Sequence, residues 1–213
     1  MKAFGKTVGK TVVFCLVMML MCSFVYPLAL TGVSQLTMKA KADGSKVDKD
    51  GNLTTDTKEA VGSALIGQDF TEDCYFQGRV SAVNYNTYTE EQEESGEYAG
   101  VASGSYNYAN SNPELKERME KDLEQFLKEH PGVKAEDVPA ELLTASGSGL
   151  DSHISPESAE VQIPTVAKNS GLSEEEVKKI VEENTEKKTL GVFGEERVNV
   201  LGCNLDIAAA MGK

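Results

Sequence analysis

The longest apolar stretch in the chain is residues 11–30, which read TVVFCLVMMLMCSFVYPLAL and contain no charged side chain. A helix rises about 1.5 Å per residue, so this stretch matches the roughly 30 Å hydrocarbon core of a bilayer. The residues before it form a short stub, and the residues after it are predominantly polar. The pattern predicts one transmembrane helix over residues 11–31, followed by a polar domain.

Charges beside this stretch predict the direction in which the helix crosses the membrane. The stub, residues 1–10, has no acidic residue and carries three lysines, Lys2, Lys6 and Lys10. Basic residues next to a span stay on the cytoplasmic side. Lys39 and Lys41 follow the stretch and weaken this asymmetry, although aspartates accompany them. We therefore expect a cytoplasmic N-terminus and an extracytoplasmic C-terminal domain.

A cleaved leader is the alternative to a retained anchor. Ala40-Lys41-Ala42 resembles a signal-peptidase site, but the apolar stretch lies far from it and exceeds the usual apolar region of about 7–15 residues. Lipid attachment at Cys22 would require small residues before the cysteine, whereas Leu20 and Met21 are large. The retained anchor is the favoured interpretation.

Turn and strand signals follow the predicted helix. Residues 32–60 form a polar connector in which Asp50-Gly51 predicts a hairpin turn. The predicted domain covers residues 61–213, and it opens with glycine-containing mixtures of apolar and polar residues. Short strands or extended segments are predicted over 62–70 and 75–83, and a strand over 197–201.

Capping residues indicate where the helices of the domain begin and end. Asn112 followed by Pro113 is typical of a helix start, and His130 with the next two residues, Pro-Gly, is typical of its end. Further helices are predicted over 140–144, from Pro156 to about Lys168 with a kink at Pro164, and after a capping box at Ser173–Glu176.

The region 84–111 is rich in Asn, Tyr, Ser and Gly and contains the acidic run 90–94. Such a composition predicts a long irregular region in which the acidic run is solvated. Together the elements predict a single N-terminal transmembrane helix followed by one mixed α+β extracytoplasmic domain with several helices and a small sheet.

The charge balance narrows the possible partners of this domain. The 213-residue chain has a formal net charge of −13, and the basic stub makes the remainder more acidic still. An acidic surface argues against nucleic acid as a partner and against docking on anionic lipid. Membrane lipid is therefore expected only around the span.

Cysteine and histidine usage limits disulfide and metal chemistry. Cys15 and Cys22 lie in the predicted span, which leaves Cys74 and Cys203 in the domain. These two could form one disulfide outside the cell, or remain small buried thiols. With only two histidines, a zinc site of the usual Cys/His type has too few ligands.

The most unusual polar stretch is a glycine-rich loop, residues 144–155, which reads TASGSGLDSHIS. Its candidate functional residues are Thr144, Ser146, Gly147, Ser148, Gly149, Asp151 and His153. In a hydrolase with His153 as base, the serine nucleophile would need the surrounding sequence G-x-S-x-G, which neither Ser146 nor Ser148 has. A tight turn or docking surface is the favoured interpretation, ahead of anion binding by loop amides and of catalysis.

Other motifs are weaker or missing. Residues 5–11, GKTVGKT, resemble a phosphate-binding loop but have three residues between the glycines where four are required. Arg79 is expected to form an ion pair or a carbonyl clamp inside the fold, with a partner contact as the alternative. The chain has no Asp-Lys-Thr-Gly phosphorylation motif and no TVGYG-like filter. The sequence therefore predicts that this chain has no catalytic centre and no ion selectivity filter of its own.

The order of several short motifs resembles a known family. They are Tyr26-Pro27-Leu28, Leu30-Thr31-Gly32, Gln35-Leu36, Gly62-Ser63, Leu65-Ile66-Gly67-Gln68, Gly78-Arg79 with Ser81, Ser111-Asn112-Pro113, TASGSGLDSHISPESA at 144–159, VNVL at 198–201 and Asn204-Leu205-Asp206. They resemble the C subunit of the potassium-transporting Kdp ATPase, the KdpC family. Val80 and Ser152 stand where that family usually has proline, so looser turns are expected there.

The resemblance implies a non-catalytic accessory subunit of a high-affinity, ATP-driven potassium import complex in a bacterial plasma membrane. Its implied partners are a channel-like A subunit, a P-type ATPase B subunit and a small F subunit. The family is described as a catalytic chaperone that raises the ATP affinity of the B subunit. ATP and K⁺ would be handled by the complex, with no cofactor bound by this chain.

The resemblance also bears on candidate site residues. Partner-docking candidates on the helix are Tyr26, Pro27, Thr31, Gly32 and Gln35. A nucleotide contact at the glycine-rich loop is implied by the family alone, and it conflicts with an extracytoplasmic domain because ATP is hydrolysed in the cytoplasm. A membrane-anchored extracytoplasmic binding module without a transport role is the alternative function.

Overall fold

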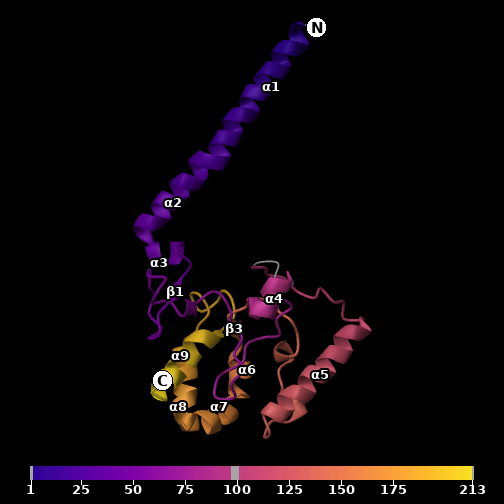
Figure 1. Ribbon diagram of the computed structural model, residues 1–213, viewed down its shortest axis with the longest axis vertical. Coiled ribbons are helices and arrows are strands. Elements are labelled where there is room, and N and C mark those ends of the chain that lie inside the picture. The colour runs from indigo at the N-terminus through magenta and orange to yellow at the C-terminus, as the bar shows by residue number, and fades with distance from the viewer. Residues whose placement is uncertain (1, 97–100, 213) are drawn as a thin grey trace.

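The computed structural model describes residues 2–96 and 101–212. One long straight rod projects from a folded domain (Figure 1). The rod consists of α1 (Lys2–Leu20), a π-helical turn (Met21–Val25) and α2 (Tyr26–Thr37). It contains the one helix of the described chain that is long and apolar enough to cross a membrane, Phe4–Thr37, and the domain buries none of its most apolar window. The predicted span is thus part of a longer helix.

The π-helical turn has a local cause in Pro27. Proline has no N–H to donate, and in a regular α-helix its ring clashes with the carbonyl four residues earlier. One turn of wider helix ends just before it, where the Tyr26 N–H donates to the Met21 oxygen. The phosphate-loop-like residues 5–11 lie inside α1, so they form no loop.

The connector folds back beneath the rod. Helix α2 ends at Met38 and the short α3 (Lys39–Ala42) follows. Strand β1 (Lys46–Val47) then pairs antiparallel with β2 (Gly62–Ser63). The predicted turn at Asp50-Gly51 is confirmed, because the Gly51 N–H donates to the Asp48 carbonyl and Gly51 has a φ of 77°.

A second antiparallel sheet has the strand order β3-β5-β4. Its strands are β3 (His153–Ile154), β4 (Thr185–Glu186) and β5 (Arg197–Asn199). The strand predicted over 197–201 is wrong beyond Asn199, because the Asn199 side chain accepts from the Gly202 N–H and starts α9 (Val200–Ala210). A side-chain cap of this kind ends a strand and begins a helix at one residue.

The helical predictions are largely confirmed. Helix α5 (Pro113–Glu129) has Asn112 as its N-cap and His130 as its C-cap. Helix α8 (Glu174–Glu183) begins with the predicted capping box between Ser173 and Glu176. Residues 140–144 form only a 3-10 turn, Ala140–Leu142, rather than a longer helical piece.

Two helical predictions need correction. The helix expected from Pro156 to Lys168 is two helices, α6 (Pro156–Glu160) and α7 (Ile163–Ser170), because Pro164 enforces a new start rather than a kink. The acidic run 90–94 lies in a short exposed helix, α4 (Glu90–Ser95), capped by Thr89 and Gln92. Short 3-10 turns complete the helical elements, at Asn84–Asn86 and Ala135–Asp137.

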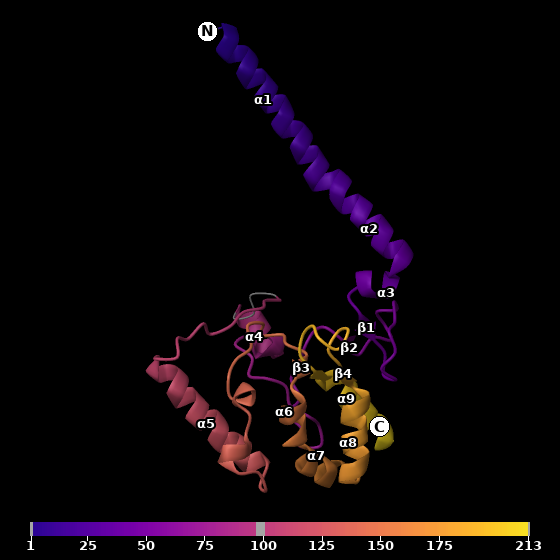
Figure 2. The ribbon, with the colours of Figure 1, turned by 180° about the vertical axis from the view of Figure 1, so that it is seen from behind.

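The core lies between the second sheet and α6, α7, α8 and α9, which the two views show packed side by side (Figures 1 and 2). Among its most buried side chains are Phe76, Ile154, Val166, Val177, Val198, Cys203 and Ile207. The architecture is thus the predicted one, a long apolar helix and a mixed domain with small antiparallel sheets. Cys74 and Cys203 are both buried, and the possible disulfide between them is not formed.

Residues 75–83 form an extended segment without regular strand pairing, and two buried amide side chains replace the missing strand partner. The Phe76 N–H donates to Asn204 Oδ1 at 2.8 Å, and Asn204 Nδ2 donates to the Phe76 carbonyl at 2.9 Å. Gln162 makes the same pair of bonds with the backbone of Gln77, at 2.8 and 3.2 Å. These bonds satisfy buried backbone groups and fix the segment that carries Arg79.

Candidate functional site

Asp151 is the centre of the glycine-rich loop, residues 144–155. Its Oδ2 accepts from the Ser146 hydroxyl at 2.7 Å and lies 3.6 Å from Arg79 Nη1. Its Oδ1 accepts from the backbone N–H of His153 at 3.1 Å. One carboxylate therefore joins the start of the loop, its end and the separate segment that carries Arg79.

Arg79 has unused hydrogen-bonding capacity. Its Nε is buried and has no hydrogen-bond partner among the described residues, although its guanidinium pairs with Asp151. The backbone of Arg79 is held separately, because its carbonyl accepts from the Tyr85 hydroxyl at 2.5 Å. The ion pair expected for Arg79 thus forms, and the buried Nε is an unsatisfied donor inside the fold.

Ser81 connects the Arg79 segment to the loop. Its hydroxyl donates to the Gly149 carbonyl at 2.6 Å and accepts from the Tyr85 N–H at 2.9 Å. The two segments lie too close together for any residue larger than glycine at position 149. A Cβ on Gly149 would lie 2.6 Å from Val83 Cγ2 and 2.9 Å from the Gly104 carbonyl oxygen. The glycine at this position is therefore required by packing.

Tyr85 occupies an unusual backbone conformation beside this contact. It and its neighbours Asn84 and Asn86 all have φ between 48° and 54°, the left-handed region that side chains other than Asn and Asp rarely adopt. The side chain lies close to Gly67 and Gly78, since a Cβ would lie 2.6 Å from its ring Cε1 at Gly67 and 2.6 Å from its hydroxyl oxygen at Gly78. Burial, followed by the charges of Asp151 and Asp69, raises the pKa of Tyr85 to about 12, so its hydroxyl stays a donor.

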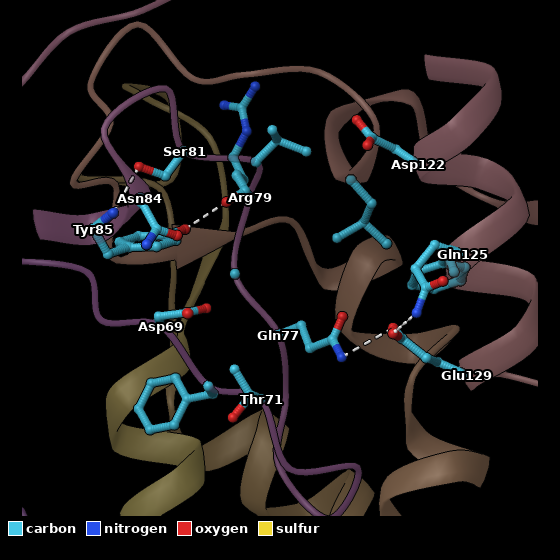
Figure 3. A pocket seen from close by; sticks show the side chains of 15 residues that line it. Asp69, Thr71, Gln77, Arg79, Ser81, Asn84, Tyr85, Asp122, Gln125 and Glu129 are labelled. Carbon is cyan, nitrogen blue, oxygen red and sulfur yellow. Dashed lines mark hydrogen bonds between the residues drawn. The ribbon is translucent and has the colours of Figure 1, made fainter. Parts of the chain in front are cut away.

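Two cavities meet at Arg79. The first, about 400 Å³, separates the segment around Arg79 from the α5 side chains Asp122, Gln125 and Glu129 (Figure 3). The second, about 660 Å³, is lined on its other sides by His153 and by the loop between β4 and β5. Burial raises the pKa of the Asp122 carboxyl, with Arg118 opposing that effect. Both cavities are polar and open to solvent, which suits a protein partner better than an apolar ligand.

His153 does not have the surroundings of a catalytic base. Its ring Nδ1 lies 3.0 Å from the Ser152 hydroxyl, but Ser152 is buried and precedes it directly in the chain. Its Nε2 lies 3.3 Å from Asn199 Nδ2 and 3.9 Å from Glu186 Oε1. Asp151 bonds the backbone of His153 rather than its ring. These contacts form no nucleophile–base–acid arrangement.

The pKa of His153 is lowered, first by burial and then by the nearby Arg197 charge. The ring is therefore neutral near pH 7, and the polar contacts around it stabilise the fold. Among the described residues no group of three or more His, Cys, Asp and Glu side chains could hold a metal ion.

The remaining predicted loop residues serve local structure. Ser148 accepts from the Leu150 N–H at 3.2 Å, and its hydroxyl lies 2.9 Å from that of Ser103. Thr144 donates to the Ala140 carbonyl at 2.9 Å. Gly147 has open space where a Cβ would be. The loop therefore presents a backbone turn rather than a set of free hydroxyls.

The helix candidates lie apart from this loop. Tyr26, Pro27, Thr31 and Gly32 are exposed on α2, and Gln35 donates to Asp43 Oδ1 at 2.7 Å. The structure thus brings Ser146, Asp151, His153 and Arg79 into one cluster. It leaves the helix residues other than Gln35 exposed along α2.

Sequence reasoning missed Tyr85 and Glu141 as members of the cluster. Glu141 Oε1 accepts from the Ser155 N–H at 2.6 Å. Burial alone would raise its pKa, but hydrogen bonds from Ser158 and Ser155 lower it on balance, so the carboxylate is charged. A signal for Tyr85 was present, since Asn residues on both sides favour a left-handed turn.

Comparison with known proteins extends the sequence resemblance over the whole chain. The family model described as "KdpC: K+-transporting ATPase, c chain" matches residues 8–209. The potassium-transporting ATPase KdpC subunit of Clostridioides difficile (strain 630) is 52% identical over 212 residues, which cover 97% of this chain and 99% of that protein. The corresponding protein of Clostridium kluyveri is 53% identical over 212 residues, covering 100% and 98%.

A more distant relative agrees with these two. The KdpC subunit of Caldanaerobacter subterraneus subsp. tengcongensis is 44% identical over 209 residues, which cover 98% of each chain. The matches include the long apolar helix, the Arg79 segment and the glycine-rich loop. The chain is therefore a membrane protein of the KdpC family, a subunit of a K⁺-transporting ATPase.

Proposed function

We propose that this chain assembles and stabilises a high-affinity, ATP-driven potassium import complex from the outer side of the membrane. The observation that carries the proposal is the bare apolar helix, because the domain buries none of the span's most apolar window. A helix that no part of its own chain covers is available to pack against other membrane subunits. The domain would then be held over their outer faces.

The charges around the span support this orientation. Lys2, Lys6 and Lys10 precede it, and basic residues beside a span are retained in the cytoplasm. An N-terminus inside places the domain outside a bacterial plasma membrane. The acidic surface of the domain would weakly attract cations, an effect screened by salt beyond about 10 Å.

Docking on the helix is assigned to Tyr26, Pro27, Thr31, Gly32 and Gln35. Small residues such as Gly32 let two helix backbones approach closely, and Thr31 offers a hydroxyl for an interhelical hydrogen bond. The partners would be the channel-like A subunit, the ATPase B subunit and the small F subunit, with lipid around the rest of the span.

Any effect on ATP affinity is proposed to pass through these membrane contacts. A domain outside the cell cannot reach a nucleotide hydrolysed in the cytoplasm. The glycine-rich loop also uses Ser146, Ser148 and Asp151 for internal hydrogen bonds, which leaves no cradle of side chains for phosphate. ATP and K⁺ therefore belong to the other subunits.

Potassium uptake in a bacterial strain that lacks its own C subunit tests the proposal. The intact chain should restore uptake at low external potassium, whereas a chain that ends after Thr37 should not. A third chain carries residues 11–30 in scrambled order together with Thr31→Val, Gly32→Leu and Gln35→Leu, which keeps the hydrophobicity for insertion but removes the docking surface. We expect it to insert without restoring uptake.

A matched control keeps the order of the span and replaces only Val12 and Val13 by Ile. This control should behave as the intact chain does. Normal uptake with the truncated chain would contradict a role for the domain. Normal uptake with the scrambled helix would contradict docking by the helix.

A further inference from the structure

The loop between β4 and β5 presents three large apolar side chains to solvent. Leu190 is 86% exposed, Val192 is 75% exposed and Phe193 is 65% exposed. Residues 189–194 carry no charge, whereas Lys187 and Lys188 precede them and two glutamates follow. We call residues 190–193 the apolar tip. Exposed apolar groups of this kind, surrounded by charged residues, are typical of interaction surfaces.

The apolar tip is held in one conformation. Thr189 and Phe193 exchange two backbone hydrogen bonds, at 2.8 and 3.0 Å, and the Gly191 N–H donates to the Lys188 carbonyl at 3.0 Å. Lys188 Nζ closes the base of the loop with an ion pair to Glu195 at 2.8 Å. A preformed loop loses little conformational freedom when it binds.

The position of the loop restricts what it can meet. Figures 1 and 2 both place the gold segment between α8 and α9, which contains this loop, at the end of the domain near β1 and β2, where the rod departs. Because the rod is embedded in the membrane, this end of the domain faces the bilayer and the subunits within it. The base of the loop, at Lys188 and Glu195, also lines the cavity of about 660 Å³ beside Arg79.

The charges near the apolar tip favour a protein over a lipid surface. Loops that insert into bilayers generally have free basic residues that bind anionic headgroups. Here Lys188 is neutralised by Glu195, and the exposed Lys187 is balanced by the exposed carboxylate of Glu196, so the loop base has no net positive charge. The domain as a whole is acidic, so anionic headgroups repel it.

We propose that the apolar tip inserts into an apolar hollow on the outer surface of a membrane subunit of the same K⁺-transporting ATPase. This inference rests on the proposed function. Phe193 and Leu190 are the anchors of the contact, and the charged residues at the loop base form its rim, the usual arrangement of a small binding hot spot.

Photocrosslinking within the assembled complex tests the proposal. Phe193 is replaced by a photoreactive phenylalanine analogue in the full chain, and native membranes that contain the complex are irradiated. We expect one protein adduct with a membrane subunit. The matched control carries the analogue at Glu174, an exposed residue at the start of α8, and should give no such adduct. Adducts with lipid alone would overturn the proposal.

A charged variant tests the same contact by function. Phe193→Glu should reduce the amount of complex that copurifies with the tagged chain at least tenfold, while Phe193→Leu keeps most of it. Because Phe193 is exposed, the thermal midpoint of the isolated full-length variant should match that of the unmodified chain. Copurification and uptake unchanged by Phe193→Glu would refute the docking of the tip. A failure of the unmodified chain to support uptake would instead refute the proposed function.

Discussion

Single residues hold the glycine-rich loop against the Arg79 segment, and glycines allow the two to approach. Gly149 and Gly147 differ in this respect although only one residue separates them. A Cβ at Gly149 would lie 2.9 Å from the Gly104 carbonyl oxygen, whereas a Cβ at Gly147 meets nothing within 4 Å. The two positions therefore form a matched pair for mutation.

Gly149→Ala should destabilise the fold by about 1–3 kcal/mol, because the backbone of one segment must move away from the other. Gly147→Ala should change the free energy of unfolding by less than about 1 kcal/mol, since its site is open and needs no left-handed backbone. Denaturant unfolding of the full-length variants in detergent measures both values. Equal losses for the two variants would contradict the packing role of Gly149.

The buried His130 and the partly buried His153 predict how stability depends on pH. His130 stacks on Phe126 with ring centroids 4.0 Å apart, and its Nδ1 lies 3.0 Å from the Phe126 carbonyl oxygen. Burial lowers its pKa, against the smaller opposing effect of that hydrogen bond, and burial likewise lowers the pKa of His153. Both rings therefore take up a proton more readily in the unfolded chain.

The direction of the pH dependence of stability follows from this difference in proton affinity between the folded and unfolded chains. An unfolded histidine binds a proton below a pH of about 6.5, while the folded one remains neutral until a lower pH. Lowering the pH from 7.5 to 5.5 should therefore lower the thermal midpoint of the full-length protein. The variant with His130→Gln and His153→Gln should show a smaller change over the same interval. A midpoint that rises on acidification would contradict the assignment of neutral buried rings.

Elements with strong local signals could be predicted from the sequence. The caps at Asn112 and Ser173 place α5 and α8 correctly, because capping depends on residues within one turn of the helix start. The division of α6 from α7 is caused by Pro164. The sequence shows this proline, but tertiary packing decides whether it kinks one helix or starts a second one.

The strands were less predictable because each has only two or three residues and depends on distant partners. The extended segment at 75–83 is held by the amides of Gln162 and Asn204, which lie far from it in the chain. No periodic pattern encodes such a contact. The same holds for the candidate site, where the Arg79–Asp151 pair joins two segments that the sequence alone could not bring together.

At the scale of the whole molecule, the exposed apolar rod and the acidic domain have separate functions. The rod provides the membrane anchor and, as proposed, a surface for other subunits. The loop between β4 and β5, which carries the apolar tip, lies at the end of the domain from which the rod leaves (Figure 2). As proposed above from the charges beside the span, the domain lies outside the cell, where it cannot contact ATP.

Cysteine labelling in intact cells tests this orientation most directly. Glu175→Cys places a thiol on the exposed side of α8, and Lys6→Cys places one in the N-terminal stub. The chain without substitution reports background labelling from its own cysteines, of which Cys74 and Cys203 are buried. A membrane-impermeant maleimide should label Glu175→Cys equally before and after cell lysis, and Lys6→Cys only after lysis. The reverse pattern would place the domain in the cytoplasm and contradict the account.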